Sequence, residues 1–375
     1  MSLMAFLNAA ERRISRHAEA RRLASRSRMA GAFTSAQSLA GTHCHCPSEL
    51  TFHHVHSEGL REAADFVVDW NSNVENPARP QLPPARIGHL AAELGPGTIV
   101  HVKADQLAAF REHVLPAIRH PVILVTGDSD MAPVQIHRQL LDHPMIAHWF
   151  AQNCDWPAEH PRLSPIPIGL DNPIYTKFEK RLGFLVDWLA GQARPGIGLK
   201  GNDTGDQTRF NSVAEFTRAS IGQKPLSVLC TFHQNHRLAP DISGMPDRMA
   251  AATALMGKSF CHFPAQRLDQ EACWRLHSQF AFEASPQGNG MDCFRTWEAL
   301  ALGSIPILRA GPLDRLFREH GLPVVIVQDW NEINEENLAK WAQIHIPQLE
   351  AARHRLSNGY WIEMIRNKAQ SVARK

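Results

Sequence analysis

The segment from Phe282 to Leu300 combines residue types that proteins use to bind phosphate groups. A short apolar run leads into Gly288, Asn289 and Gly290, and a helical pattern follows. Glycine permits backbone angles and close approaches that a side chain would forbid. The N-terminus of a helix offers unpaired N–H groups and the positive end of the helix dipole. The order of strand, glycine turn and helix therefore predicts an anion site.

Two charged residues of the predicted helix indicate which anion would suit this site. Arg295 and Glu298 lie three positions apart, so they share one helix face. An arginine there can contact phosphate oxygens, and a glutamate can accept hydrogen bonds from ribose hydroxyls. The pair therefore favours a nucleoside diphosphate.

The surrounding sequence predicts an α/β protein. Continuous apolar strands that alternate with helices are typical of parallel sheets covered on both faces. A helix is expected over residues 105–118, a second near Arg248 and a third from Asn334 onward. Strands are expected over residues 98–102, 121–126, 226–232 and 279–282, among others.

Length and composition favour two domains and exclude a general nucleic-acid binder. The chain has 375 residues, more than one hydrophobic core usually holds, and 44% of them are hydrophobic. The formal net charge is only +2. A proline-rich stretch over residues 71–86 predicts a loop, and a glycine-rich stretch over 191–205 predicts a linker. The predicted parts are a basic segment 1–30, an N-terminal domain 31–205, a second domain 206–345 and a helical segment 346–375.

The first thirty residues place seven arginines among apolar residues at roughly helical spacing. Such a segment can lie on an anionic membrane surface, and a solvated helix or one packed on a partner is the alternative. Seven cysteines without a recognisable signal peptide favour a reducing, cytoplasmic location. If the basic segment lies on a membrane, the expected location is the inner face of that membrane. No apolar run reaches membrane-spanning length.

The histidines do not predict a metal centre. His43, Cys44, His45 and Cys46 alternate along the chain, so they would point to opposite faces of a strand instead of converging on zinc. His54 and His56 are candidates for residues of an acceptor cleft.

The segment after the glycine turn extends the pattern through Leu302-Gly303-Ser304-Ile305-Pro306-Ile307-Leu308, Leu322-Pro323-Val324-Val325-Ile326-Val327 and Asp329-Trp330. Over roughly residues 225–345 the chain resembles an exostosin-like (GT47-type) glycosyltransferase. The segments TGDSD, WFAQN and IPIGL extend the resemblance into the first half.

The resemblance implies a GT-B fold, in which two Rossmann-like domains face each other across a cleft and a C-terminal helix crosses back to the first. It implies transfer of a hexosyl or pentosyl group from a nucleotide-diphosphate sugar, with UDP favoured, to a hydroxyl of a glycan or lipid-linked glycan. Inversion at the anomeric carbon and a place in surface polysaccharide or lipopolysaccharide synthesis are further expectations.

An inverting transfer needs a general base. Asp128 and Asp130 are the candidates, because they follow the strand ending at Thr126, where open α/β sheets bind ligands. An Asp-x-Asp pair also suits Mg²⁺ or Mn²⁺. A helix cap or a turn held by Asx hydrogen bonds is the structural alternative. No cofactor is predicted to be required.

By the resemblance, Arg237 and Arg248 are predicted to clamp the diphosphate. A surface salt bridge is the alternative for either arginine, and Arg275 is a weaker candidate. The complete donor-binding prediction comprises Arg237, Arg248, Gly288, Asn289, Gly290, Asp292, Arg295 and Glu298. Two other functions stay open: a different GT-B enzyme, such as a sugar-nucleotide epimerase or phosphorylase, and a non-catalytic module that binds a sugar nucleotide or glycan.

Overall fold

A computed structural model describes residues 54–68, 91–170, 204–232, 247–266 and 268–374. The basic N-terminal segment, the His43–Cys46 cluster, the proline-rich loop and Arg237 lie outside the described residues, as does nearly all of the predicted linker. Every described element belongs to one compact unit, residues 47–375. The predicted domain boundary near residue 205 stays a prediction.

The first sheet contains five parallel strands in the order β1-β2-β3-β4-β5, which is also their order in the chain. All six residues of β3 are buried, as expected for a strand covered on both faces. The strands are β1 (Phe66–Val68), β2 (Ile99–Lys103), β3 (Val122–Gly127), β4 (Ile146–Ala151) and β5 (Leu163–Pro165).

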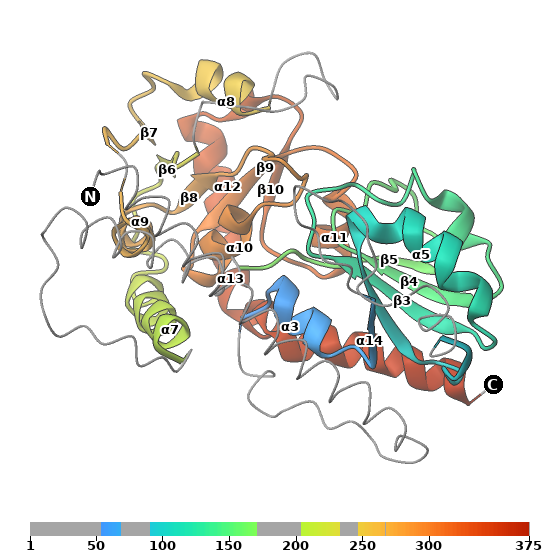
Figure 1. Cartoon of the computed structure of the whole chain (residues 1–375). Coiled ribbons are helices and arrows are strands. Elements are labelled where there is room, and N and C mark those ends of the chain that lie inside the picture. Colours follow the sequence, from blue (N-terminus) through green and yellow to red (C-terminus); the bar gives the residue numbers. More distant parts are fainter. Residues whose placement is uncertain (1–53, 69–90, 171–203, 233–246, 267, 375) are drawn as a thin grey trace, which may run out of the picture. The chain divides into compact units, whose positions relative to one another are not determined.

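The second sheet also contains five parallel strands, but their order is β10-β9-β8-β6-β7 (Figure 1). The chain passes from β6 outward to β7 and then returns to the other side of β6 to form β8. Neighbouring connections therefore leave the sheet in opposite directions at β6 and β8, which makes this point a topological switch. The strands are β6 (Val228–Leu229), β7 (Cys261–His262), β8 (Phe282–Ala284), β9 (Ile305–Arg309) and β10 (Val325–Val327).

The α/β prediction with two parallel sheets is confirmed by these strands and the helices between them. The helices are α3 (Ser57–Glu62), α5 (Leu107–His113), α7 (Thr204–Arg218), α8 (Asp247–Leu255), α9 (Gln270–Leu276), α10 (Phe294–Ala301), α11 (Asp314–Glu319), α12 (Glu335–His345), α13 (Gln348–Ala351) and α14 (Asn358–Ala373). Short 3-10 helices are η2 (Ala104–Gln106), η3 (Leu115–Ala117), η4 (Arg138–Leu141), η5 (His277–Gln279), η6 (Trp330–Glu332) and η7 (Arg353–Leu356).

One predicted helix is interrupted. The pattern over residues 105–118 predicts a continuous helix, whereas the structure forms η2, α5 and η3 in succession. Pro116 lies in η3 near its start. Proline has no N–H to donate, and its ring disfavours helical backbone at the preceding residue. The α-helix therefore ends at His113.

The C-terminal helix α14 returns to the first sheet, where it contacts β2, β3, β4 and α3. Gly97, which has a φ of +78°, lies against its backbone, since a Cβ there would be 2.4 Å from the carbonyl oxygen of Ala369. The predicted crossing is confirmed. None of the described helices combines the length and apolarity that a membrane span requires.

Candidate anion-binding site

The predicted anion site lies at the switch point of the second sheet. Thr231 follows β6, and the loop over residues 285–293 connects β8 to α10. Open α/β sheets bind ligands at the carboxyl ends of strands where the order reverses. The topology therefore places the glycine turn where a ligand is expected.

Gly288 and Gly290 allow other side chains to approach the turn closely, and neither has an unusual backbone angle. Neither is among the residues with positive φ, so that part of the prediction is wrong. A Cβ on Gly288 would lie 2.7 Å from Nη2 of Arg248, and one on Gly290 would lie 2.9 Å from the side-chain amide of Asn153. A side chain at position 290 would collide with the buried, hydrogen-bonded amide of Asn153, whereas one at position 288 would meet only the end of the flexible Arg248 side chain. Asn289, between them, is exposed.

The first two residues of α8, Asp247 and Arg248, form hydrogen bonds with the loop over residues 285–293. The N–H of Gln287 donates to Asp247 Oδ2 at 2.8 Å, and Arg248 Nε donates to the carbonyl of Gln287 at 3.1 Å. Asp247 Oδ1 also accepts from Trp330 Nε1 at 2.9 Å. Burial, together with the charge of Arg295, lowers the pKa of Arg248. Arg248 thus lies at the predicted site, where its observed role is to fix the turn.

Asp292 fixes the start of α10. Its carboxylate is buried and accepts from the N–H of Ile168 at 2.8 Å, the N–H of Cys293 at 2.9 Å and Nε1 of Trp297 at 2.9 Å. Burial raises its pKa to about 6, against the lowering effect of these hydrogen bonds. These observed contacts are all with protein groups, and they account for the residue structurally. Its predicted contact with a donor stays a prediction.

Asn153 is a site residue that the sequence reasoning missed. It is fully buried with a φ of +47°. Its Nδ2 donates to the carbonyl of Ser129 at 3.0 Å, and its Oδ1 accepts from the N–H of Asp292 at 2.8 Å. The side chain therefore connects the loop after β3 to the loop before α10. The only sequence signal is an amide at the end of an apolar strand, since asparagine tolerates positive φ.

The two aspartates proposed as bases follow β3. Asp128 has a φ of +55°, and its N–H donates to Oε1 of Gln152 at 2.9 Å. Asp130 is exposed. A non-glycine residue at positive φ is held there by its surroundings, and such residues cluster at functional sites. Within the described ranges, no three or more His, Cys, Asp or Glu residues form a group suited to hold a metal.

The N-terminus of α10 has no capping bond from the side chain of its N-cap residue, Cys293, within the described structure. At the other end, Lys224 Nζ donates to the carbonyls of Leu302 at 3.0 Å and Gly303 at 2.8 Å, and Arg218 Nη1 donates to that of Leu300 at 3.1 Å. Cations at the C-terminus complement the helix dipole. The cations at the C-terminus and the Asp292 carboxylate beside the N-terminus both complement the dipole of α10.

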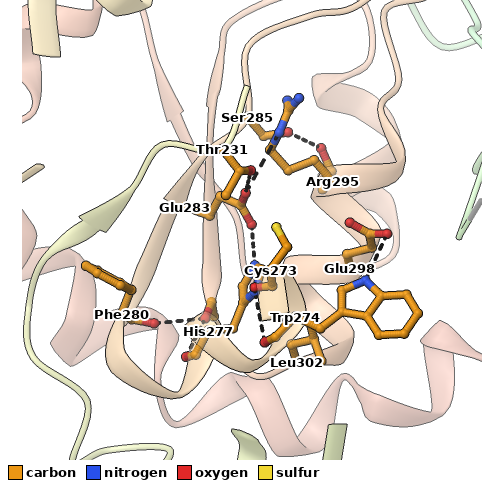
Figure 2. A network of polar contacts seen from close by, with 12 residues as sticks. Thr231, Cys273, Trp274, His277, Phe280, Glu283, Ser285, Arg295, Glu298 and Leu302 are labelled. Atoms are coloured by element: carbon orange, nitrogen blue, oxygen red, sulfur yellow. Dashed lines mark hydrogen bonds and ion pairs between the residues drawn. The ribbon is translucent and has the colours of Figure 1, made fainter. Parts of the chain in front are cut away.

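Arg295 and Glu298 lie on α10 as predicted, and Figure 2 shows both with their partners. Arg295 Nη1 donates to the carbonyl of Pro286 at 3.4 Å, and its guanidinium lies 5.9 Å from the centre of the Phe232 ring. Glu298 accepts from Trp274 Nε1 at 3.2 Å. Burial raises the pKa of the Glu298 carboxyl group.

A second group of residues that the sequence reasoning did not assign to the site surrounds the Glu283 carboxylate, next to Arg295. The Glu283 carboxylate is completely buried and accepts from Thr231 Oγ1 at 2.5 Å. Its Oε2 lies 2.5 Å from His277 Nε2, and its Oε1 lies 3.8 Å from Arg295 Nε. Figure 2 shows Glu283 between Arg295 and His277. The sequence signal was a glutamate inside the apolar run that forms β8.

The remaining candidates have partners outside the glycine turn. His56 is buried, and its N–H donates to Oδ1 of Asn358 at the start of α14 at 3.2 Å. The ring of His54 contacts that of Phe210 edge to face at 5.1 Å. Arg275 forms an exposed ion pair with Glu271 at 2.8 Å. The acceptor roles of the two histidines stay predictions.

No protein-family model matches the chain, and no curated protein matches it. Among solved structures, it is similar to an α,α-trehalose-phosphate synthase (UDP-forming) from Burkholderia vietnamiensis, with a TM-score of 0.37, 13% identity and coverage of 77% of this chain and 79% of that one. The enzyme of the same name from Burkholderia xenovorans, in complex with glucose-6-phosphate, gives 0.36, 12%, 76% and 77%. An Escherichia coli structure described as trehalose-6-phosphate bound with UDP-2-fluoro glucose gives 0.30, 11%, 77% and 76%. At these values the similarity says nothing about what the chain binds or catalyses.

Proposed function

We propose that the chain is a glycosyltransferase that takes its sugar from a nucleotide-diphosphate sugar. The observation that carries the proposal is the position of the α10 N-terminus at the switch between β6 and β8, with Arg295 and Glu298 on the same helix. A helix N-terminus and a guanidinium suit a diphosphate, and the neighbouring carboxylate suits ribose hydroxyls. The sequence resemblance to exostosin-like enzymes agrees with this chemistry.

In the proposed reaction, an acceptor hydroxyl attacks the anomeric carbon of the donor sugar. The bond from that carbon to the diphosphate oxygen breaks, and the nucleoside diphosphate leaves with the bonding electrons. Asp128 takes the proton of the attacking hydroxyl as general base. Arg295, Arg248 and the N-terminus of α10 stabilise the charge that develops on the diphosphate. Attack opposite the leaving group inverts the anomeric carbon.

The finer features of the proposal come from the resemblance and the sequence. UDP is the favoured nucleotide, and the acceptor is a glycan or lipid-linked glycan used in a surface polysaccharide or lipopolysaccharide. The arginine-rich segment 1–30 would then hold the protein at the inner face of the membrane. No metal is required in this scheme.

Calorimetry of the full chain with UDP-, GDP-, CMP- and dTDP-sugars, with and without Mn²⁺, tests the proposal. We expect saturable binding of one nucleotide class without Mn²⁺, and transfer of its sugar to a glycan acceptor with inversion. Binding of none would remove the proposed donor site. Binding without transfer to any acceptor would favour the non-catalytic module.

A further inference from the structure

A buried acid lies beside the arginine that is proposed to hold the diphosphate. The Glu283 carboxylate is 0% exposed, and its Oε1 is 3.8 Å from Nε of Arg295. An ionised carboxylate in this position would cancel the charge of the guanidinium and repel a diphosphate, since both effects are strong away from water. Arg248 lies at the same turn, but the charge of Arg295 would reach the anion only if another cation neutralised this carboxylate.

The geometry around His277 provides that cation. Its Nδ1 lies 3.2 Å from the carbonyl oxygens of both Cys273 and Trp274, and carbonyls only accept, so Nδ1 carries a hydrogen. Its Nε2 lies 2.5 Å from Oε2 of Glu283, whose other oxygen accepts from the Thr231 hydroxyl and lies 3.8 Å from Arg295 Nε. A hydrogen on Nε2, donated to this carboxylate, would complete an imidazolium. Burial by itself would lower the pKa of His277, but the charge of Glu283 and its hydrogen bond outweigh burial and raise it.

The other charged groups nearby are committed to different partners. Glu298 accepts from Trp274 Nε1, and Lys224 Nζ donates to the carbonyls after α10. Cys230 and Cys273 also lie near Glu283, and the pKa of each thiol is raised, Cys230 by its hydrogen bond to Cys261 and Cys273 by burial. Among the described residues, His277 is the cation within hydrogen-bond distance of Glu283.

We propose that His277 is a positioning residue for diphosphate binding: by holding Glu283 in a short hydrogen bond, it keeps Arg295 available to the nucleotide. Glu283 lies 2.5 Å from His277 but 3.8 Å from Arg295, so the histidine is the tighter partner. The three side chains together carry one net positive charge. This inference depends on the proposed function, because it takes a nucleoside diphosphate as the ligand.

The test measures the affinity of the full chain for UDP by calorimetry, with GDP and dTDP in parallel. In His277→Gln, Glu283 should capture Arg295, and we expect binding at least about tenfold weaker. The double variant His277→Gln/Glu283→Gln removes both charges of the pair, so its affinity should return to within about threefold of the wild-type value. Glu283→Gln alone should bind at least as tightly as the wild type.

His148→Gln is the matched control, because His148 is also a buried histidine with one side-chain partner, Ser164, but lies in the first sheet. Its UDP affinity should not change. A folded His277→Gln variant with wild-type affinity, or a double variant as weak as the single one, would overturn the inference. If His277→Gln does not fold, Glu283→Gln decides, since binding tenfold weaker there would show that Glu283 aids the anion. Absence of nucleotide binding by the wild type would instead remove the proposed function, and this inference with it.

Discussion

The two parallel sheets have the same number of strands but treat buried histidines in opposite ways. In the first sheet, burial lowers the pKa of His101 and of His148 to about 3, so both are neutral. In the second, the buried His277 has a raised pKa because it contacts Glu283. The strand orders differ as well, since among the described strands the switch point lies in the second sheet. The histidine whose pKa is raised by a buried carboxylate thus belongs to the sheet with the switch point.

The largest expected effect tests whether the first sheet supplies the reaction's base and nothing to donor binding. Asp128→Asn should lower turnover by roughly 10²–10⁴-fold, the usual contribution of a general base. Donor affinity should stay nearly unchanged, because the donor contacts are assigned to the second sheet. Rates of sugar transfer and calorimetric affinities of the same preparation check both statements. Full activity would end the assignment, whereas a matching loss of affinity would move Asp128 into the donor site.

The next effect concerns the start of α10, where the Asp292 carboxylate accepts hydrogen bonds from Ile168 in the first half of the chain and from Cys293 in the second. Asp292→Ala leaves the N–H groups of Ile168 and Cys293 and the indole of Trp297 without their acceptor. We expect a loss of roughly 3–5 kcal/mol in the free energy of unfolding, from the cost of several unsatisfied buried donors. Urea unfolding measures it. Asp292→Asn, which keeps one acceptor oxygen, should lose clearly less, and equal losses would contradict this explanation.

Removing the proposed ribose contact should weaken donor binding without affecting the first sheet. Glu298→Ala is expected to reduce affinity for the donor by roughly 1–3 kcal/mol, as for a lost buried hydrogen-bond partner. Calorimetry with the nucleotide sugar and with the free nucleoside diphosphate should show the same loss of affinity, because both ligands contain the ribose. Glu271→Ala, which changes a partly exposed glutamate of α9, is the control. Unchanged affinity in Glu298→Ala would exclude the residue from the site.

The smallest effect sharpens the comparison of the histidines. His148, with a folded pKa below the ordinary value of 6.5, binds its proton only on unfolding, so it destabilises the protein as pH falls below about 6.5. At pH 5 this amounts to about 2 kcal/mol. His277 has a raised folded pKa, so its contribution is fully present below 6.5 and is lost as pH rises through the folded value.

Two variants should therefore differ in the direction of their pH dependence. Relative to the wild type, His148→Gln should become more stable as pH falls from 7 to 5. The destabilisation of His277→Gln should be greatest at low pH and shrink at alkaline pH. Urea unfolding between pH 5 and 9 compares them. Parallel pH profiles for the two variants would refute the distinction between the sheets.

Local patterns predicted much of the candidate site. The apolar strand, the glycines and the helix that follows are contiguous, so their geometry depends mainly on nearby backbone, and β8, the turn and α10 occur in the expected order. The strand expected over residues 279–282 is shifted, since η5 ends at Gln279 and β8 begins at Phe282. The reason given for the glycines was only half right. Whether a glycine serves an angle or a close approach depends on which side chain packs on it, and Arg248 and Asn153 are distant in the sequence.

By itself, the sequence determined the α/β class, the parallel strands and the helix that presents Arg295 and Glu298, because periodicity and glycine placement act over a few residues. Only the tertiary structure decided that β6 and β8 are neighbours, that Asn153 reaches Asp292 and that His277 pairs with Glu283. Those contacts depend on strand order and on loops that bring remote residues within hydrogen-bond distance. A buried charge is tolerated only where such a contact compensates it, so the charges of this site could not be assigned before the fold was known.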